Sequence, residues 1–459
     1  MYSDIIVIGG GAAGLMAAYG AARALVEAGS TAQVTVLEKM PRPARKVMIT
    51  GKGRCNFTNL KDWNSFSAHI RTNPNFVKPA FFNFTPEDSI RFFESVGMEA
   101  LVERGDRAYP ASHHASDVVD ALVRACHGAG VKILCGQEAG QIEYGVVTSS
   151  GKGCFRIDGN YRCDCLIVAT GGLSYPATGS TGDGYRFASG AGHSLSPLFP
   201  SLTALVPKGY KQTEPDPEMP GHIDRSQPLS ELGKAFCGIQ LKNIGVQLLV
   251  EGTLAQEEFG DLDFTDGGIE GPIGFQISRK AVKSLLNGSR VSVVLDLKHG
   301  VPSGELAARI KVLWQEIDRD PRSRKLHEKE KCRILLGKLM PWDLIPAFRQ
   351  MNPGIMTLER RGRTDTKVWV NLPTIAKALK EWRFDIEGFV GYERAVVTAG
   401  GVNTSEVIAK TLESRKMPGL FFCGEVLDID ADTGGYNLHL AFATGLLAGQ
   451  SAAKSLIGK

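Results

Sequence analysis

The first forty residues combine two short apolar runs with a long apolar helix between them. Residues 5–8 are all aliphatic, a cluster of glycines follows at 9–14, and the next stretch is apolar on all sides of a helix. A second, mostly aliphatic run lies at 32–39. Such runs are typical of buried strands, so the pattern predicts a strand–helix–strand unit at the start of the chain.

Further periodic segments predict more elements of the same kind. Residues 114–130 have helical spacing, with Ser116 as a possible cap. The runs 131–136 and 163–172 predict strands. Strands that alternate with helices predict an α/β fold of the Rossmann-like type.

The middle of the chain has a different pattern of apolar and polar residues. Residues 202–300 hold short alternating segments separated by Gly, Pro and Asp, which predict antiparallel strands. Residues 303–382 instead alternate charged and apolar positions at helical spacing. We therefore expect a discontinuous α/β domain (1–199 and 391–459), an inserted β-rich domain (200–302 and 383–390) and a small helical domain (303–382).

Composition narrows the class of protein. The chain has 459 residues, 43% of them hydrophobic, and its formal charge of +4 favours neither nucleic acid nor a membrane surface as a partner. Nine cysteines without a C-x-x-C pair favour buried thiols in a reducing cytoplasm and argue against a metal site. The uncharged stretch 5–22 is rich in glycine and follows Asp4, which argues against a membrane span or a secretory signal.

The glycine cluster has the spacing of a dinucleotide site. Gly9, Gly11 and Gly14 form G-x-G-x-x-G between the predicted strand and helix, where the helix amino terminus can hold a pyrophosphate. Glu38 ends the second strand, where a carboxylate can accept bonds from ribose hydroxyls and would repel the 2′-phosphate of NADP. The residues predicted to bind the cofactor here are Gly9, Gly11, Ala13, Gly14, Glu38 and Lys39.

The carboxyl-terminal segment favours FAD over NAD. Residues 417–425 predict a strand ending in Gly424 and Glu425, and after an acidic loop Gly435, Tyr436 and Asn437 open a long helix. Because FAD extends well past its pyrophosphate, it needs such a second holding point. Glu425 could bind a ribityl hydroxyl, and the helix dipole could stabilise reduced flavin. The alternative is a glycine-rich turn with a docking helix.

Two other segments carry turn-forming residues. The strand predicted at 163–172 breaks at Thr170 and Gly171, where backbone can pass close to a dinucleotide, although a plain turn explains it nearly as well. The stretch 46–59 is basic and rich in Gly and Asn, and by composition alone it fits a solvated loop.

Five segments together resemble the flavoproteins of the BaiN/YhiN type, often described as aminoacetone-oxidase-like or NAD(P)/FAD-dependent oxidoreductases. The segments are Gly9–Gly14, 51–59, 169–185, 398–402 and 424–445. The resemblance covers nearly the whole chain and implies non-covalently bound FAD with an inserted β-rich and helical part. It also implies that the loop wraps the cofactor through Lys46, Gly51, Gly53, Arg54, Cys55 and Asn56.

By this resemblance, Lys46 and Arg54 would offset phosphate charge and Asn56 would donate to the flavin edge. Cys55 could approach the flavin, but no second thiol lies beside it. His439, one turn into the last helix, is expected to be a packed helix residue.

The expected function is an FAD-dependent oxidoreductase that transfers a hydride between flavin N5 and a small organic substrate. Either NAD(P)H visits transiently or oxygen accepts the electrons, and the sequence favours neither a reductase nor an oxidase. An NAD-dependent dehydrogenase without flavin is one alternative. A non-catalytic flavin-binding regulatory or RNA-associated protein is another, supported by the basic stretch 319–333. Residues for acid–base catalysis are not assigned.

Overall fold

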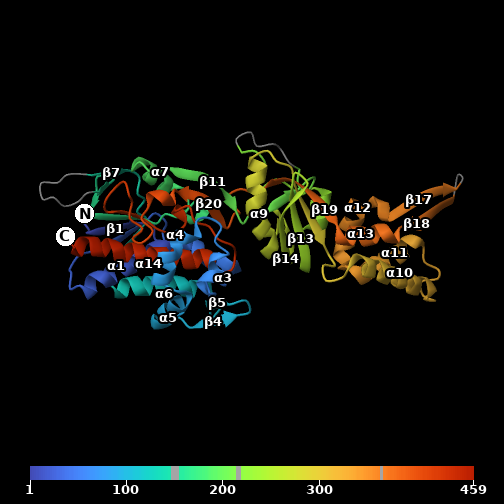
Figure 1. The fold of residues 1–459 in the computed structure, drawn as a ribbon, viewed down its shortest axis with the longest axis horizontal. Coiled ribbons are helices and arrows are strands. Elements are labelled where there is room, and N and C mark those ends of the chain that lie inside the picture. Colours follow the sequence, from blue (N-terminus) through green and yellow to red (C-terminus); the bar gives the residue numbers. More distant parts are fainter. Residues whose placement is uncertain (146–154, 213–218, 362–364, 459) are drawn as a thin grey trace. The chain divides into compact units, whose positions relative to one another are not determined.

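The protein is divided into two compact units. The structure, a computed structural model, describes residues 1–145, 155–212, 219–361 and 365–458. The first unit joins Met1–Pro200 to Ala395–Lys459, and the second is Ser201–Arg394 (Figure 1). The chain therefore leaves the first unit, builds the second, and returns. Cys154 lies outside the described residues.

A five-stranded parallel sheet in the order β21-β10-β1-β2-β6 forms the centre of the first unit. Its strands are β1 (Ile5–Ile8), β2 (Val34–Glu38), β6 (Lys132–Cys135), β10 (Cys165–Val168) and β21 (Leu420–Phe422). All strands but β6 are buried along their whole length, as near-continuous aliphatic runs in a parallel sheet predict. The predicted Rossmann-like α/β fold is confirmed.

Helices α1 (Ala12–Glu27) and α14 (Tyr436–Ile457) pack with their backbones in close contact. A Cβ atom on Gly445 would collide with the carbonyl oxygen of Ala13, and one on Gly449 with that of Ala17. Glycine therefore sets the separation of the first and last helices of the chain.

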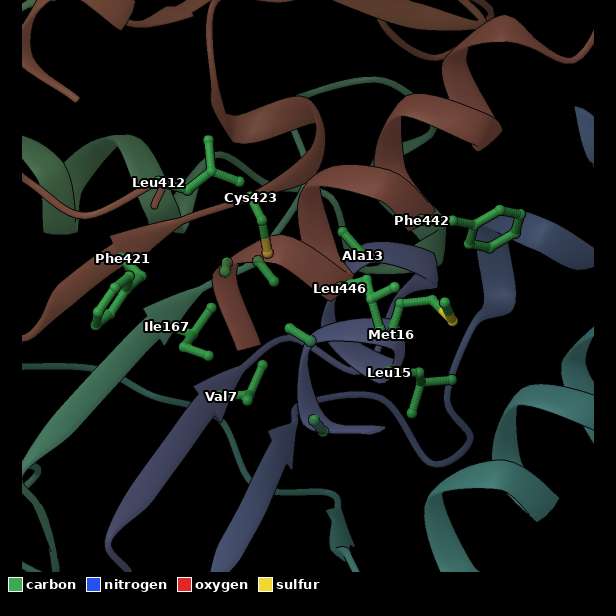
Figure 2. Close-up of a cluster of buried hydrophobic side chains, with 14 of the residues drawn as sticks. Val7, Ala13, Leu15, Met16, Ile167, Leu412, Phe421, Cys423, Phe442 and Leu446 are labelled. Atoms are coloured by element: carbon green, nitrogen blue, oxygen red, sulfur yellow. The ribbon is translucent and has the colours of Figure 1, made fainter. Parts of the chain in front are cut away.

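The core of the first unit joins sheet and helices. Figure 2 shows Val7 and Ile167 of the sheet in one buried cluster with Met16 of α1 and Leu446 of α14. The two ends of the chain thus share one core.

Shorter elements surround this sheet. The helices are α2 (Arg45–Met48), α3 (Trp63–Ser67), α4 (Pro74–Asn83), α5 (Pro86–Ser95), α6 (Ala115–Gly128) and α7 (Asp183–Gly190). The sheets β3-β5-β4 and β7-β8-β9 are antiparallel, and β11 and β20 form a further two-stranded sheet. Their strands are β3 (Thr58–Asn59), β4 (Ala100–Glu103), β5 (Arg107–Pro110), β7 (Ile142–Tyr144), β8 (Phe155–Ile157), β9 (Tyr161–Cys163), β11 (Leu195–Ser201) and β20 (Val397–Val402).

The predicted cap of α6 at Ser116 is wrong. The helix begins at Ala115 with His114 as its N-cap, so Ser116 lies inside the first turn. His113 has a left-handed backbone (φ 58°), which turns the chain into the helix before Ser116 is reached.

The second unit contains a closed barrel in the order β12-β15-β14-β13-β16-β19. Its strands are β12 (Leu205–Pro207), β13 (Gln240–Val250), β14 (Thr253–Thr265), β15 (Gly268–Glu270), β16 (Val291–Asp296) and β19 (Trp382–Phe389). The antiparallel pairs agree with the alternating pattern of this region. Helix α9 (Gly271–Leu286) was not predicted, because Gly271 and Pro272 at its start suggest a turn.

A helical part with one hairpin completes the second unit. Its elements are α8 (Glu231–Phe236), α10 (Ser303–Arg319), α11 (Glu328–Leu339), α12 (Ile345–Met351), α13 (Leu372–Lys380), β17 (Met356–Arg361) and β18 (Asp365–Val370). The separation of 200–302 from 303–382 as two domains stays a prediction. Within the described residues, every helix is too short or too polar to cross a lipid bilayer.

Candidate cofactor-binding site

The glycine turn between β1 and α1 is shaped by close backbone contacts. Gly9 has φ 100°, and a Cβ there would lie 2.6 Å from the carbonyl oxygen of Ala169. A Cβ on Gly14 would collide with the carbonyl oxygen of Gly9. At Gly11, by contrast, no described atom lies within 4 Å of the Cβ position. The turn is therefore tight on its inner side and open at its second glycine.

The amino terminus of α1 faces this open position. Gly11 is the N-cap, and within the described chain no side chain caps the helix there. The amides of the first turn therefore have no intrahelical acceptor, and the helix dipole adds partial positive charge. Open space next to such amides suits a phosphate group.

Glu38 lies at the end of β2, directly behind the turn. Its two carboxylate oxygens accept from the amides of Gly10 and Met40, each at 2.7 Å. The neighbouring Lys39 forms an ion pair with Asp183 at 2.7 Å. Lys39 is thus already neutralised, whereas Glu38 keeps free lone pairs on both oxygens.

Four side chains from distant segments form a second cluster, which we call the carboxylate cluster: Lys46, Ser174, Thr398 and Glu425. The Lys46 Nζ donates to Glu425 Oε2 and to Ser174 Oγ, both at 2.8 Å. The other carboxylate oxygen accepts from Ser174 Oγ at 2.7 Å and from the amide of Thr398 at 2.8 Å. Lys46 and Glu425 are 379 positions apart in the chain.

The carboxylate cluster holds Glu425 in its ionised form. Burial alone would raise the pKa of this carboxyl, but the charge of Lys46 and the hydrogen bonds from Lys46, Ser174 and Thr398 outweigh it and place the pKa below its ordinary value. Ser174 and Thr398 are fully buried, whereas the side chains of Lys46 and Glu425 remain 24% and 20% exposed. The ion pair thus borders accessible space.

The loop that carries Lys46 has an unusual backbone. Ala44, Lys52 and Cys55 have left-handed φ values of 54°, 57° and 55°, and Gly51 and Gly53 are also left-handed. Left-handed non-glycine residues are strained and cluster at functional sites. Cys55 is fully buried, and burial raises the pKa of its thiol to about 12, so the thiol stays protonated at neutral pH.

Arg54 and Asn56 are both held by contacts within the protein. Arg54 pairs with Glu103 and lies 4.5 Å from the centre of the Tyr109 ring, so its charge is already balanced. The Asn56 amide nitrogen donates to the carbonyl oxygens of Thr58 (2.8 Å) and Ala108 (2.9 Å), which uses both of its hydrogens. Donation from Asn56 to a flavin edge stays a prediction, and it would need one of these two hydrogen bonds to be exchanged. The buried Oδ1 has no partner within the described residues and is an acceptor.

The start of α14 is a double-glycine turn. Gly434 and Gly435 have φ values of 118° and 95°, and a Cβ on Gly435 would lie 2.6 Å from the carbonyl oxygen of Thr58. The Asn437 side chain accepts from the Ala431 amide (2.9 Å) and donates to its carbonyl oxygen (2.8 Å), closing the acidic loop.

Residues 69–72 pair with the acidic loop through His69, Arg71 and Thr72. Arg71 donates to both oxygens of Asp432, and Thr72 donates to Asp430 at 2.9 Å. His69 Nδ1 lies 3.0 Å from Asp432 Oδ2, and its ring stacks on Tyr436 with 4.4 Å between centroids. Burial and the charge of Asp432 raise the pKa of Tyr436 to about 12, so this phenol is neutral.

The remaining predicted positions lie beside α1 and α7. Gly424 has φ 73°, and a Cβ there would lie 2.6 Å from that of Ala13. Gly171 is also left-handed, and the Thr170 hydroxyl occupies the space that a side chain on Gly184 would need. Positions 13, 170, 171 and 424 thus lie at the carboxyl-terminal edge of the sheet.

His439 packs as predicted. It is fully buried beside the rings of Phe66, Phe81 and Phe84, and burial lowers its pKa to about 3. Thr58 Oγ1 lies 3.0 Å from its Nδ1.

The structure thus brings Lys46 and Glu425 together and sets the glycine turn beside Gly424. Sequence reasoning missed Ser174, Thr398, His69 and Asp432 as site residues. Ser174 and Thr398 lie inside segments that carry the family resemblance, a signal that could have found them. Nothing in the sequence pairs His69 with Asp432. Across the described residues, no group of three or more His, Cys, Asp or Glu side chains could hold a metal ion.

Comparisons with known proteins place the chain in a family. The model of the HI0933-like protein Rossmann domain matches residues 3–451. A 3-dehydro-bile acid delta(4,6)-reductase of Clostridium scindens is 33% identical over 98% of both chains. A ribosomal RNA dihydrouridine synthase of Haemophilus influenzae is 30% identical over 96% of both chains.

Among solved structures, 3-ketosteroid delta1-dehydrogenase from Sterolibacterium denitrificans matches with a TM-score of 0.47 and 12% identity, over 99% of this chain and 100% of the other. The resemblance inferred from the five segments is confirmed by the family model and by the relatives. The chain belongs to the HI0933-like family, the BaiN/YhiN type of FAD-dependent oxidoreductases.

Proposed function

We propose that this enzyme binds FAD non-covalently along the carboxyl-terminal edge of the first unit's sheet and reduces a carbon–carbon double bond conjugated to a carbonyl group. NAD(P)H is the proposed reductant. The observation that carries the cofactor part is the coincidence of two features at one sheet edge. Open space adjoins the uncapped amides of α1, and a charged, partly exposed ion pair lies beside it.

The residues fit the parts of FAD in turn. Gly11 and the first turn of α1 would hold the pyrophosphate, and Glu38 would accept from the adenosine ribose. Lys46 and Glu425 would bind the ribityl chain. The first turn of α14 would stabilise negative charge on the pyrimidine edge. Lys39 and Arg54, already paired with Asp183 and Glu103, would shape the rim.

The other predicted residues would act through the backbone or through packing. Left-handed glycines would let the chain approach the cofactor closely, and Asn437 would hold the acidic loop beside it. The residues concerned are Gly9, Ala13, Gly14, Gly51, Gly53, Cys55, Asn56, Thr170, Gly171, Gly424, Gly435, Tyr436 and Asn437.

The substrate class is supported by the names of the two relatives. When bound, FAD supplies a hydride at N5. A 3-dehydro bile acid has a ketone conjugated to its 4,6 double bonds, and dihydrouridine arises when the uridine double bond next to a carbonyl is saturated. The two names thus describe one type of bond change. We assign that bond change to this enzyme, rather than oxidation of an amino ketone.

RNA is a second candidate substrate. Besides the relative's name, the helical part of the second unit carries Arg333 over the half-exposed ring of Trp342, at 5.6 Å. Cations next to exposed aromatic rings are typical of RNA-binding surfaces. The expected absence of a nucleic-acid partner stays a prediction. RNA binding that weakens steeply with salt would contradict it.

Anaerobic stopped-flow measurements test the proposal. The purified protein should carry FAD, and its absorbance should bleach with NADH or NADPH. The reduced protein should then be reoxidised faster by a 3-oxo-4-ene steroid or a uridine-containing RNA than by oxygen. Reoxidation by oxygen alone, with aminoacetone as the reductant, would establish the oxidase instead. A colourless protein that binds no added FAD would refute the cofactor assignment.

A further inference from the structure

The His69–Asp432 pair has the arrangement of an acid–base dyad. Asp432 is 2% exposed at its side chain and receives both guanidinium bonds of Arg71, which fix its orientation. His69 is 31% exposed, and its Nδ1 lies 3.0 Å from the carboxylate. Because a carboxylate only accepts, the proton of neutral His69 lies on Nδ1.

The second imidazole nitrogen remains free for chemistry. No hydrogen-bond partner of His69 Nε2 is found in the described part of the chain. The ring cannot easily rotate, because it stacks on Tyr436 at an interplanar angle of 19°. Tyr436 is the first residue of α14, the helix whose amino terminus we assign to the flavin. A held, partly exposed imidazole thus lies beside the helix end that we assign to the flavin.

We propose that His69 is the general acid that protonates the substrate during double-bond reduction, with Asp432 as its positioning residue. This inference rests on the proposed function. Reduced FAD, when bound, would supply the two electrons and the hydride for the new C–H bond at the β carbon. The π electron pair moves onto the carbonyl oxygen as an enolate. In its protonated form His69 carries a hydrogen on both ring nitrogens, and the α carbon takes the one on Nε2. The carbonyl re-forms, His69 is left neutral with its hydrogen on Nδ1, and solvent returns a proton to Nε2.

Charged and polar groups from several segments surround His69. Asp432 faces the ring from the acidic loop, Arg71 lies beyond that carboxylate, and the neutral phenol of Tyr436 covers one ring face. Asp106 and Arg107 lie near Tyr436 and carry opposite charges. Asp432 thus contacts the ring directly, whereas Arg71, Asp106 and Arg107 reach it only through Asp432 or Tyr436.

The test separates the two half-reactions. His69→Gln should keep FAD content and the rate of flavin reduction by NADPH, because neither needs this proton. Reoxidation of the reduced enzyme by a 3-oxo-4-ene steroid should slow by at least about 100-fold. The wild-type rate of that step should fall as pH rises, because a general acid acts only while protonated, and the variant should lose this dependence. His127→Gln, an exposed histidine at the end of α6, is the matched control and should behave as wild type.

Two results would overturn the inference while leaving the proposed function intact. One is an unchanged steroid half-reaction in His69→Gln with its pH profile preserved. The other is a parallel loss of FAD content and of both half-reactions, which would give His69 a structural role. If the reduced wild-type enzyme is not reoxidised by any enone or uridine, the proposed function fails and the inference falls with it.

Discussion

The two halves of the proposed cofactor site are built by opposite means. The glycine turn with Glu38 spans about thirty consecutive residues and is shaped by backbone contacts that exclude side chains. The carboxylate cluster assembles Lys46, Ser174, Thr398 and Glu425 from four segments and is held by charge and hydrogen bonds. Substitutions that add a side chain should therefore destabilise the glycine turn, largely independently of pH. The stability of the carboxylate cluster should instead depend on pH and on substitutions that remove a charge.

The largest effect is expected at the glycine turn. Gly14→Ala places a methyl group against the carbonyl oxygen of Gly9 and should destabilise the first unit by about 3 kcal/mol, the upper end for overpacking. Gly11→Ala meets open space and should change the unfolding free energy by less than ~0.5 kcal/mol, yet weaken FAD binding because its methyl group enters the phosphate position.

Calorimetry of the FAD-free protein and FAD titration measure the two quantities. A Gly14→Ala protein as stable as wild type would show that the turn can relax. Wild-type FAD affinity in Gly11→Ala would show that the open space is not the phosphate position.

A loss of stability of intermediate size is expected when the pH is lowered. His439 is buried and neutral, with a pKa of about 3 against an ordinary value of 6.5. Between these values the unfolded chain takes up a proton that the folded protein excludes, so stability falls as pH falls. From pH 6.5 to 4.5 this loss is about 2–3 kcal/mol. His439→Phe should remove that part of the acid sensitivity in urea titrations at each pH.

His127→Gln should leave the acid sensitivity as in wild type, because that side chain is exposed. If His439→Phe lost stability in acid as steeply as wild type, His439 would have to take up its proton while folded.

The smallest effect is expected from the ion pair of the carboxylate cluster. Lys46→Met or Glu425→Gln should each cost about 2 kcal/mol, below the value for a fully buried pair because both side chains are partly exposed. The double variant should cost less than the sum of the singles. Because the Glu425 pKa is lowered in the folded protein, its contribution is present above pH 4.5 and is lost as pH falls further.

Urea titration of the three variants and wild type at pH 7 gives the coupling energy. Ser174→Ala, which removes one donor to Glu425, should reduce that coupling. Strict additivity of the two charge changes would mean that Lys46 and Glu425 act independently in solution.

The parts of the fold and site that the sequence could predict are the local ones. The spacing of three glycines predicts the turn formed by Gly9, Gly11 and Gly14. The apolar pattern predicts β1, β2 and α14. Lys46 and Glu425 were predicted separately, but no local signal reports that their side chains meet. Ser174 and Thr398 lie in segments that carry the family resemblance, but their contacts with Glu425 likewise join distant segments.

Other misses had a readable signal. Helix α5 begins with a capping box formed by Thr85 and Asp88, and Pro86 is its first residue. Both features are visible in the sequence and could have predicted the start of this helix. The hydrogen bonds of Asn56 had no such signal, since its amide donates to the backbone carbonyls of Thr58 in β3 and Ala108 in β5. Only the pairing of β3 with β5 brings the second carbonyl close.

The glycine contacts between α1 and α14 have a consequence for biosynthesis. The ribosome completes α1 (Ala12–Glu27) long before it reaches α14 (Tyr436–Ile457), the helix against which α1 packs. The nascent first unit must therefore keep an apolar face and the edge strand β10 uncovered while the whole second unit emerges. Chains that terminate before residue 420 lack both β21 and α14. Such fragments should expose apolar surface and an unpaired strand edge, and should therefore aggregate or bind chaperones.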